Sequence, residues 1–206
     1  MVKKIVGTGV LLVLALALQA GVKMYTLKSP DGKVKLEVTA GQGIAYSLFY
    51  DGRLLLKPSR IALHTDLPEA DHWENIRITG TKQRHVSETV QAPFYRVKEF
   101  GIDCNELELR LNNGFSLLMR AYNDGMAYRF VAGRKGEMTV VEERAEFNFA
   151  DDFEAYIPYS TNPKDPWNMA FQNFYTKAPL TQYNTELPAF LPLTVDAGAV
   201  KLTLLE

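Results

Sequence analysis

The fold of this chain is decided by the stretch Asn105-Glu106-Leu107-Glu108-Leu109-Arg110-Leu111-Asn112-Asn113-Gly114-Phe115 and its continuation Asn123-Asp124-Gly125-Met126-Ala127-Tyr128-Arg129-Phe130. Leucines alternate with charged residues from 105 to 111, which is the pattern of a strand with one face in a core and one in water. Asn113-Gly114 and Asp124-Gly125 are dipeptides that tolerate positive φ in two-residue hairpin turns. The stretch therefore predicts three consecutive half-buried strands, with the carboxylates of Glu106 and Glu108 in solvent.

Short strand-like runs separated by turn signals fill most of the chain after residue 24. Turn signals such as Asp51-Gly52 recur about every eight to twelve residues, and no segment keeps a helical period for more than about two turns. This pattern is typical of an all-β sandwich or barrel. Two segments interrupt it. Residues 65–73 are mostly polar, and residues 160–179 exceed the usual length of a connection, which is common in functional loops.

The composition is that of an ordinary globular protein with one large or two small domains. The chain has 206 residues, of which 47% are hydrophobic and 23% charged. A formal net charge of -1 and the lack of a long basic run give no reason to expect nucleic acid as a partner. Cys104 is the only cysteine, so an intramolecular disulfide is impossible, and its apolar neighbours predict an inert thiol in or near the core.

The first residues have the composition of a secretory leader. Lys3 and Lys4 precede an apolar run over residues 10–18, and small residues follow at 20 and 21. Such a run is too short for a membrane span. We therefore expect a signal peptide over residues 1–20, a periplasmic or secreted protein without a membrane span, and a mature β domain over residues 24–206. A buried amino-terminal helix is the alternative. The chain stops at Glu206 directly after a strand-like run, which suggests a truncated protein.

The sequence contains no familiar catalytic motif. It lacks a P-loop, a dinucleotide-binding glycine motif and a nucleophile elbow, and the histidines at 64, 72 and 85 have no metal-ligand spacing. Sugar hydrolysis uses two carboxylates that flank the scissile bond. The densest acidic cluster, Asp151, Asp152 and Glu154, is instead expected to form a solvated turn. We therefore predict no catalytic residue in this chain.

The long segment at residues 160–179 is the best candidate for function. Asp165, Trp167, Phe174 and Tyr175 combine a carboxylate with large apolar rings, and amide side chains are interleaved with them. Sugars present both C–H faces and hydroxyl groups, so such a segment suits a carbohydrate, and we name these four residues as candidate substrate contacts. The alternative is that the rings close one end of the core, because large aromatic side chains often dominate cores.

Several short motifs resemble the amino-terminal domain of the glycoside hydrolase family 97 enzymes, which are secreted α-glucosidases and α-galactosidases typical of gut Bacteroidetes. The resemblance covers residues 25–206, and its motifs are specific in their order and spacing. They are Leu27-Lys28-Ser29-Pro30-Asp31-Gly32, Glu88-Thr89-Val90-Gln91-Ala92-Pro93-Phe94-Tyr95, Cys104-Asn105-Glu106-Leu107, Arg120-Ala121-Tyr122-Asn123-Asp124-Gly125-Met126-Ala127-Tyr128-Arg129 and Ala155-Tyr156-Ile157-Pro158.

The resemblance implies an antiparallel β-super-sandwich similar to the galactose mutarotase fold, packed against a catalytic (β/α)₈ barrel that is absent from this chain. It implies that the catalytic glutamates lie on that barrel. It also implies a calcium ion beside the active site, held mostly by barrel glutamates and by one glutamate from the long loop of this domain. The matching position here is Gln172, whose neutral carbonyl oxygen is still a possible calcium ligand.

The sequence thus predicts a non-catalytic amino-terminal domain of a calcium-dependent α-glycosidase. Its partners would be its own carboxy-terminal barrel and an oligo- or polysaccharide. Two alternatives stay open. One is a free-standing carbohydrate-binding module that uses the same aromatic loop. The other is a mutarotase-like aldose epimerase, which would need a histidine, such as His85, and a glutamate that face each other in a cleft.

Overall fold

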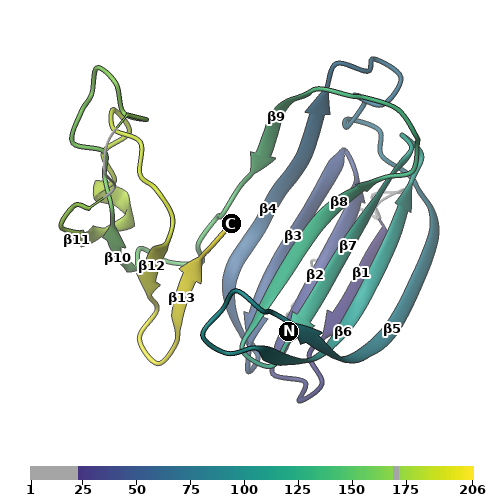
Figure 1. The fold of residues 1–206 in the computed structure, drawn as a ribbon, viewed down its shortest axis with the longest axis horizontal. Coiled ribbons are helices and arrows are strands. Elements are labelled where there is room, and N and C mark those ends of the chain that lie inside the picture. Colours follow the sequence, from purple (N-terminus) through teal and green to yellow (C-terminus); the bar gives the residue numbers. More distant parts are fainter. Residues whose placement is uncertain (1–22, 169–171) are drawn as a thin grey trace, which may run out of the picture.

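The protein is built from antiparallel β-sheets, as the alternating sequence predicts. The computed structural model describes residues 23–168 and 172–206 (Figure 1). Thirteen strands and one short 3₁₀ helix occur in these residues, so the predicted all-β class is confirmed. The predicted signal peptide over residues 1–20 lies outside the described part. No helix in that part is long and apolar enough to cross a membrane.

Sheet A has the strand order β1-β2-β3-β4-β9, and every pair in it is antiparallel. The predicted turn at Asp51-Gly52 joins β3 to β4, and both of its residues have positive φ, 48° and 79°, as predicted. The strands are β1 (Lys23–Lys28), β2 (Val34–Gly41), β3 (Gly43–Tyr50), β4 (Arg53–Thr65) and β9 (Val140–Ala145).

Sheet B has the order β5-β6-β7-β8 and is also antiparallel. The strands are β5 (Ile78–Gln91), β6 (Glu99–Leu111), β7 (Phe115–Tyr122) and β8 (Gly125–Ala132). The two turns that the sequence predicted in this sheet, after β6 and after β7, differ from the prediction. The first has three residues, with Gly114 at φ 85°, and the second consists of Asn123 and Asp124, neither of which has positive φ. Gly125 instead begins β8, where it pairs with Tyr122.

Sheets A and B face each other and form the sandwich at the right of Figure 1, with the core between them. The alternating leucines of β6 point inward as predicted, and so do alternate residues of β2 and β7. Side chains with no exposed surface in this layer are Leu36, Val38, Leu107, Leu109, Leu117 and Met119. Cys104 is also fully buried, which confirms the prediction of a buried thiol.

The segment predicted as a polar interruption closes one end of the core. Between β4 and β5 the buried side chains are Ala70, Trp73 and Ile76. The indole N–H of Trp73 donates to the carbonyl oxygen of Leu63 at 3.0 Å, and its ring contacts Phe115 and Phe130 at centroid distances of 6.2 and 5.2 Å. This segment is therefore part of the folded body and not a simple surface loop.

A third, smaller sheet lies beside the sandwich, at the left of Figure 1. Sheet C has the order β11-β10-β12-β13, and a 3₁₀ helix (Leu180–Gln182) follows β11. The main chain that leads into sheet C is hydrogen-bonded to β4 of sheet A. The Lys57 N–H donates to the carbonyl oxygen of Asn148 at 2.7 Å, and the Ala150 N–H donates to that of Leu55 at 2.9 Å. Its strands are β10 (Glu154–Ile157), β11 (Thr176–Pro179), β12 (Leu193–Asp196) and β13 (Lys201–Leu204).

Candidate functional site

The predicted functional segment, residues 160–179, follows β10 and ends with β11, and polar side chains hold the part between the two strands. The side-chain oxygen of Asn162 accepts hydrogen bonds from the backbone N–H groups of Lys164 and Asp165, at 3.2 and 3.3 Å. The side chain of Asn173 donates to the carbonyl oxygen of Tyr159 at the other end of the segment. These Asx-type contacts shape the connection, whose described residues between β10 and β11 form no regular helix or strand. Residues 169–171 lie outside the described residues.

The described aromatic residues of this segment, at positions 167, 174 and 175, are exposed and do not close the core. Trp167 is 73% exposed, Phe174 is fully exposed and Tyr175 is 47% exposed. The carboxylate-bearing Asp165 is also on the surface. The alternative that these rings complete the sandwich is therefore wrong for these three residues. The structure places all four predicted substrate contacts on one surface connection, where ring faces are accessible to a ligand.

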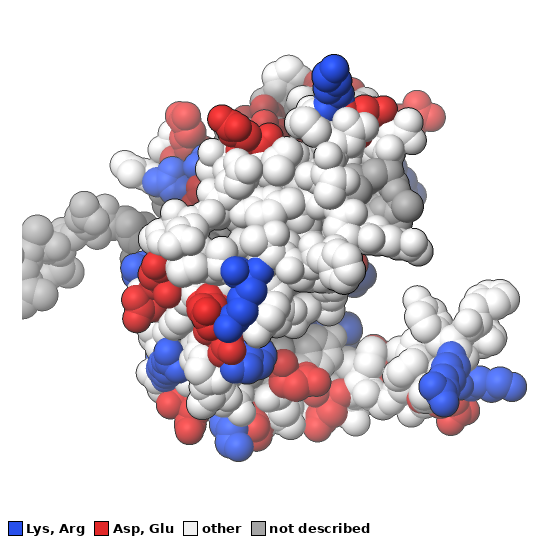
Figure 2. Space-filling view, turned by 90° about the vertical axis from the view of Figure 1, so that its left-hand side faces the viewer, with Lys and Arg blue, Asp and Glu red and all other residues white. Residues whose placement is uncertain are grey.

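The face of the molecule around sheet C is poor in charged side chains. Seen from the side of this sheet, a broad uncharged area separates the acidic and basic groups at its margins (Figure 2). Exposed large apolar residues of this part of the chain are Tyr156, Trp167, Phe174, Tyr175, Leu191 and Leu205. Such a concentration of exposed apolar surface is characteristic of binding faces.

Gln172, the predicted metal ligand, lies on the same segment and is exposed. Calcium takes about six to eight oxygen ligands, usually with several carboxylates among them. The described residues contain no group of three or more His, Cys, Asp or Glu side chains that could hold a metal ion. The donor that this segment offers at Gln172 is a single neutral amide oxygen, so the described residues fit at most one position of a calcium site.

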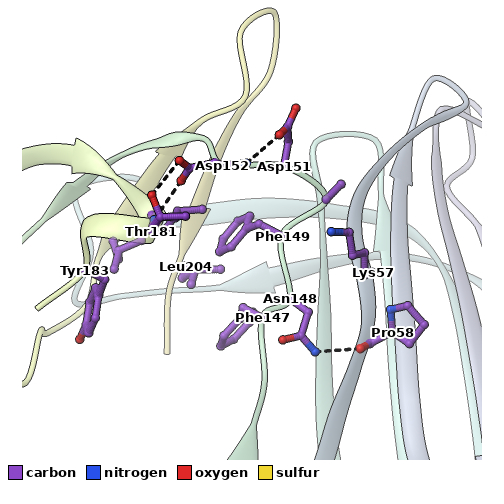
Figure 3. Close-up of a pocket in the computed structure, with 13 residues that line it drawn as sticks. Lys57, Pro58, Phe147, Asn148, Phe149, Asp151, Asp152, Thr181, Tyr183 and Leu204 are labelled. Atoms are coloured by element: carbon purple, nitrogen blue, oxygen red, sulfur yellow. Dashed lines mark hydrogen bonds between the residues drawn. The ribbon is translucent and has the colours of Figure 1, made fainter. Parts of the chain in front are cut away.

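A groove of about 890 Å³ separates sheet C from the sandwich (Figure 3). Phe147 and Phe149 come from the segment that links β9 to β10, and both point toward Leu204 on β13. Polar groups of Lys57, Asn148 and Thr181 lie at its rim. Sequence reasoning missed this groove, because its walls come from segments more than a hundred residues apart. The alternating aromatics of residues 147–149 were its only local signal.

The acidic cluster beside the groove is structural. Both carboxylate oxygens of Asp152 accept hydrogen bonds from Thr181, from its N–H at 2.9 Å and its hydroxyl at 2.8 Å. Glu154 forms an ion pair with Lys177 at 2.9 Å. These carboxylates thus tie β10 to the segment beside it. Nothing in this arrangement sets two carboxylates on opposite sides of a sugar-sized space, as hydrolysis requires.

The histidine named for the mutarotase alternative lies on β5, an edge strand. His85 contacts the side chains of Asn105 and Asp103, both at 3.1 Å, and about half of its side chain is exposed. Its partners are therefore on the adjacent strand, and neither is a glutamate across a cleft. This geometry gives no support to an epimerase site at His85.

Glu106 is not in solvent, contrary to the prediction from strand alternation. Its residue surface is only 4% exposed, and its two carboxylate oxygens accept hydrogen bonds from Arg84 at 2.7 Å and Arg120 at 2.8 Å. Burial acts to raise the pKa of Glu106, but the two guanidinium groups outweigh it and hold that pKa below its usual value. The carboxylate also raises the pKa of Arg120. The signal was absent locally, because the arginines lie on the two neighbouring strands.

The curated relatives of this chain are much longer proteins. A retaining alpha-galactosidase from Bacteroides thetaiotaomicron is 39% identical over 198 residues, which cover 93% of this chain and 30% of that protein. A probable retaining alpha-galactosidase from Streptomyces bingchenggensis is 26% identical, over 75% of this chain and 24% of that protein. The chain thus spans less than a third of the length of either relative.

Solved structures share the fold at low sequence identity. A glycoside hydrolase family 97 enzyme from Pseudoalteromonas sp. strain K8, in complex with panose, superposes with a TM-score of 0.65 and 19% identity, over 83% of this chain and 26% of that one. A beta-arabinopyranosidase structure gives a TM-score of 0.70 and 22% identity, over 83% and 29% of the two chains.

The family assignment rests on a sequence model that spans almost all of the described residues. The family described as Glycosyl-hydrolase 97 N-terminal matches residues 27–206. The same residues contain both faces of the sandwich, sheet C and the aromatic connection. This chain belongs to the glycosyl-hydrolase 97 N-terminal family.

Proposed function

We propose that this chain acts as the non-catalytic amino-terminal domain of a periplasmic or secreted α-glycosidase, whose catalytic barrel is supplied by a longer polypeptide. The observation that carries the proposal is the exposed aromatic connection between β10 and β11, in a domain without an opposed pair of carboxylates. The domain would support the barrel and form one wall of its sugar pocket. The names of the longer relatives favour an α-galactoside as the substrate, with α-glucosides as the alternative.

The aromatic connection suits a pyranose ring. Trp167 and Phe174 offer flat apolar faces that can cover the C–H side of a sugar, and their rings are not used by the core. Asp165 and neighbouring amide side chains offer acceptors and donors for hydroxyl groups. In this role the segment would orient the substrate and exclude water on one side of the pocket. Bond cleavage would be carried out by residues of the barrel.

The calcium role is limited to one ligand. Gln172 lies five residues after Trp167, on the same exposed segment, and its amide oxygen is of the type that calcium binds. We propose that it completes a calcium site whose remaining ligands belong to the barrel. When bound, the ion would supply electrostatic stabilisation beside the reacting sugar.

An apolar hairpin tip is a second surface that suits the barrel. The turn between β5 and β6 exposes Phe94 almost completely, together with Tyr95 and Val97. Phe100, at the start of β6, stacks edge-on against Tyr95 at a centroid distance of 6.3 Å. Water-exposed aromatics in such a cluster are typical of a surface that is covered in an assembly. We propose that the barrel covers this tip.

Trp167 provides the direct test of the sugar-wall role. In a chimera in which this chain replaces the matched segment of the Bacteroides retaining alpha-galactosidase, Trp167→Ala should lower kcat/KM for a galacto-oligosaccharide by about fivefold, because one stacking contact contributes on the order of 1 kcal/mol. The measurement is steady-state kinetics with the chimera and its variant. Met24→Ala, which removes another exposed side chain on β1 of the sandwich, should leave kcat/KM unchanged.

Two results would count against this proposal. An unchanged kcat/KM in Trp167→Ala would show that the aromatic connection does not contact the substrate. If calorimetry instead showed that the isolated chain binds the oligosaccharide, and that Trp167→Ala abolished this binding without any effect on turnover, the chain would be a carbohydrate-binding module.

A further inference from the structure

The two sheets of the sandwich are unequal at the side of β8 and β9. Sheet A has five strands and sheet B has four, and the ring of Tyr128 on β8 lies against Tyr46 on β3, at a centroid distance of 6.2 Å. β8 is the last strand of sheet B, and its Tyr128 lies against β3, the third strand of sheet A. β9, at the edge of sheet A, therefore extends beyond β8. All six residues of β9 are exposed, including Val140 and Val141, at 51% and 68%. A strand of a two-layer sandwich normally buries one face, and β9 buries neither.

The free side of β8 presents hydrogen-bonding groups and apolar side chains together. The N–H group of Gly133 donates to the carbonyl oxygen of Gly114 at 2.9 Å. These residues lie opposite each other just beyond β8 and β7, so they form a hydrogen-bonded pair of the antiparallel ladder. Because such pairs alternate along an antiparallel ladder, the N–H groups of Met126, Tyr128 and Phe130 point to the free side. Their side chains are only partly buried against the core.

The opposite edge of sheet B has a different character. β5 carries Lys82, Arg84 and His85 along its length, and most of its residues are exposed. Charged residues on an edge strand protect it against pairing with a further strand. The residues of β8 whose N–H groups face the free side are Met126, Tyr128 and Phe130. None of these three is charged. Arg129 is the one charged residue of β8, so the edge at β8 is less protected by charge than the edge at β5.

Two tyrosine hydroxyl groups lie near this edge, and one of them has no partner among the described residues. The Tyr46 hydroxyl is buried without a hydrogen-bond partner among the described residues. The neighbouring Tyr128 hydroxyl donates to Glu143 of β9 at 3.1 Å. Burial, and then the charge of Glu143, raise the pKa of Tyr128.

We propose that β8 accepts one further β-strand, which comes from the part of a longer family member that follows the region matched here. This inference rests on the proposed function, because it needs the longer polypeptide. The added strand would bond to the free N–H groups of β8, cover Tyr128 and Phe130, and lie over the exposed inner side of β9. Strand addition of this kind is a common way to bury a free sheet edge. The relatives, more than three times as long as the matched region, have the additional chain to supply it.

Amide hydrogen exchange tests the proposal and provides its own control. In this chain alone, the N–H groups of Met126, Tyr128 and Phe130 should exchange fast, and those of Ala127, Arg129 and Val131, which bond to β7, should exchange slowly. In the Bacteroides alpha-galactosidase chimera described above, the first three should slow by at least about 100-fold, and the edge amides of β5 should not change. Residue-resolved exchange by NMR of the isolated chain, and by mass spectrometry with electron-transfer fragmentation for the chimera, gives these rates.

Two outcomes would overturn the proposal. Fast exchange at Met126, Tyr128 and Phe130 in the chimera would show that no strand pairs with β8. Equal slowing of all six amides, those bonded to β7 included, would indicate general stabilisation without strand addition. Activity of the same chimera on a chromogenic α-galactoside is measured separately, so an active chimera with fast β8 amides would refute the added strand and leave the proposed function standing.

Discussion

Replacing Glu106 by alanine should lower the free energy of unfolding by about 3 kcal/mol, one of the two largest effects expected from a single substitution in this chain. The carboxylate is buried between Arg84 and Arg120, and the Arg120 side chain is itself only 23% exposed. Removal of the carboxylate would leave this mostly buried guanidinium without its acidic partner, and the limited access of water would only partly replace the lost hydrogen bond. Urea denaturation followed by circular dichroism measures the change.

Glu108 is the matched control for this substitution. It lies two residues along the same strand and points to the same side of sheet B, but its contact with Arg110 is long, at 4.0 Å. Glu108→Ala should therefore change the free energy of unfolding by less than about 0.5 kcal/mol. A combined replacement of Glu106 by leucine and of both arginine partners by methionine should recover most of the loss, because no unpaired charge remains. Equal losses in the two single variants would contradict the buried-cluster argument.

The same carboxylate should affect acid stability. Because the pKa of Glu106 is lower in the folded protein than its unfolded value of about 4.5, its contribution is complete above pH 4.5 and is lost as the pH falls through the folded-state pKa. The free energy of unfolding should therefore decrease on acidification below about pH 4.5 in the natural sequence. In Glu106→Gln this part of the decrease should be missing, which denaturation curves at several pH values between about 2 and 6 would reveal.

Replacing Trp73 by alanine should cost about 3–5 kcal/mol of unfolding free energy. Trp73 is 6% exposed, fills the end of the sandwich between Phe115 and Phe130, and donates its indole N–H to a backbone carbonyl. Its loss would create a cavity in the core and leave the carbonyl oxygen of Leu63 without this donor. The midpoint of urea denaturation measures the effect.

Trp167, the other tryptophan of the chain, serves as the control for this effect. It is 73% exposed and makes no ring contact with the core, so Trp167→Ala should change the unfolding free energy by less than about 0.5 kcal/mol. The two variants remove the same side chain from a buried and an exposed position. A large stability loss in Trp167→Ala would show that this ring packs in the fold, and it would withdraw Trp167 from the proposed sugar wall.

Local sequence patterns predicted the elements whose neighbours along the chain are also their neighbours in space. The alternating leucines of β6 placed its inward face correctly, and Asp51-Gly52 formed the positive-φ turn that its residues allow. Sheet C was harder to predict, because β10 and β11 have four residues each and β11 lies inside the segment that was interpreted as a connection.

The position of each functional candidate depended on more than local pattern. The types and order of Asp165, Trp167, Phe174 and Tyr175 were enough to indicate a sugar-binding segment, but only the structure shows their rings in water. The burial of a side chain depends on which other segments of the chain cover it, and the periodicity of the sequence does not contain that information. The same holds for Glu106 and Trp73, which alternation and local polarity placed in solvent or in a polar loop.

The sequence by itself determined the antiparallel β class, the inward faces of the long strands and the family, because these depend on residue order and on contacts between adjacent strands. The tertiary structure alone decided the burial of Glu106 between two arginines, the groove beside sheet C and the free edge of β8. Each of these depends on how side chains of different strands or sheets come together in space, which the local pattern of one strand does not contain. Their energies come from desolvation and packing among those segments, and these exist only once the sheets have assembled.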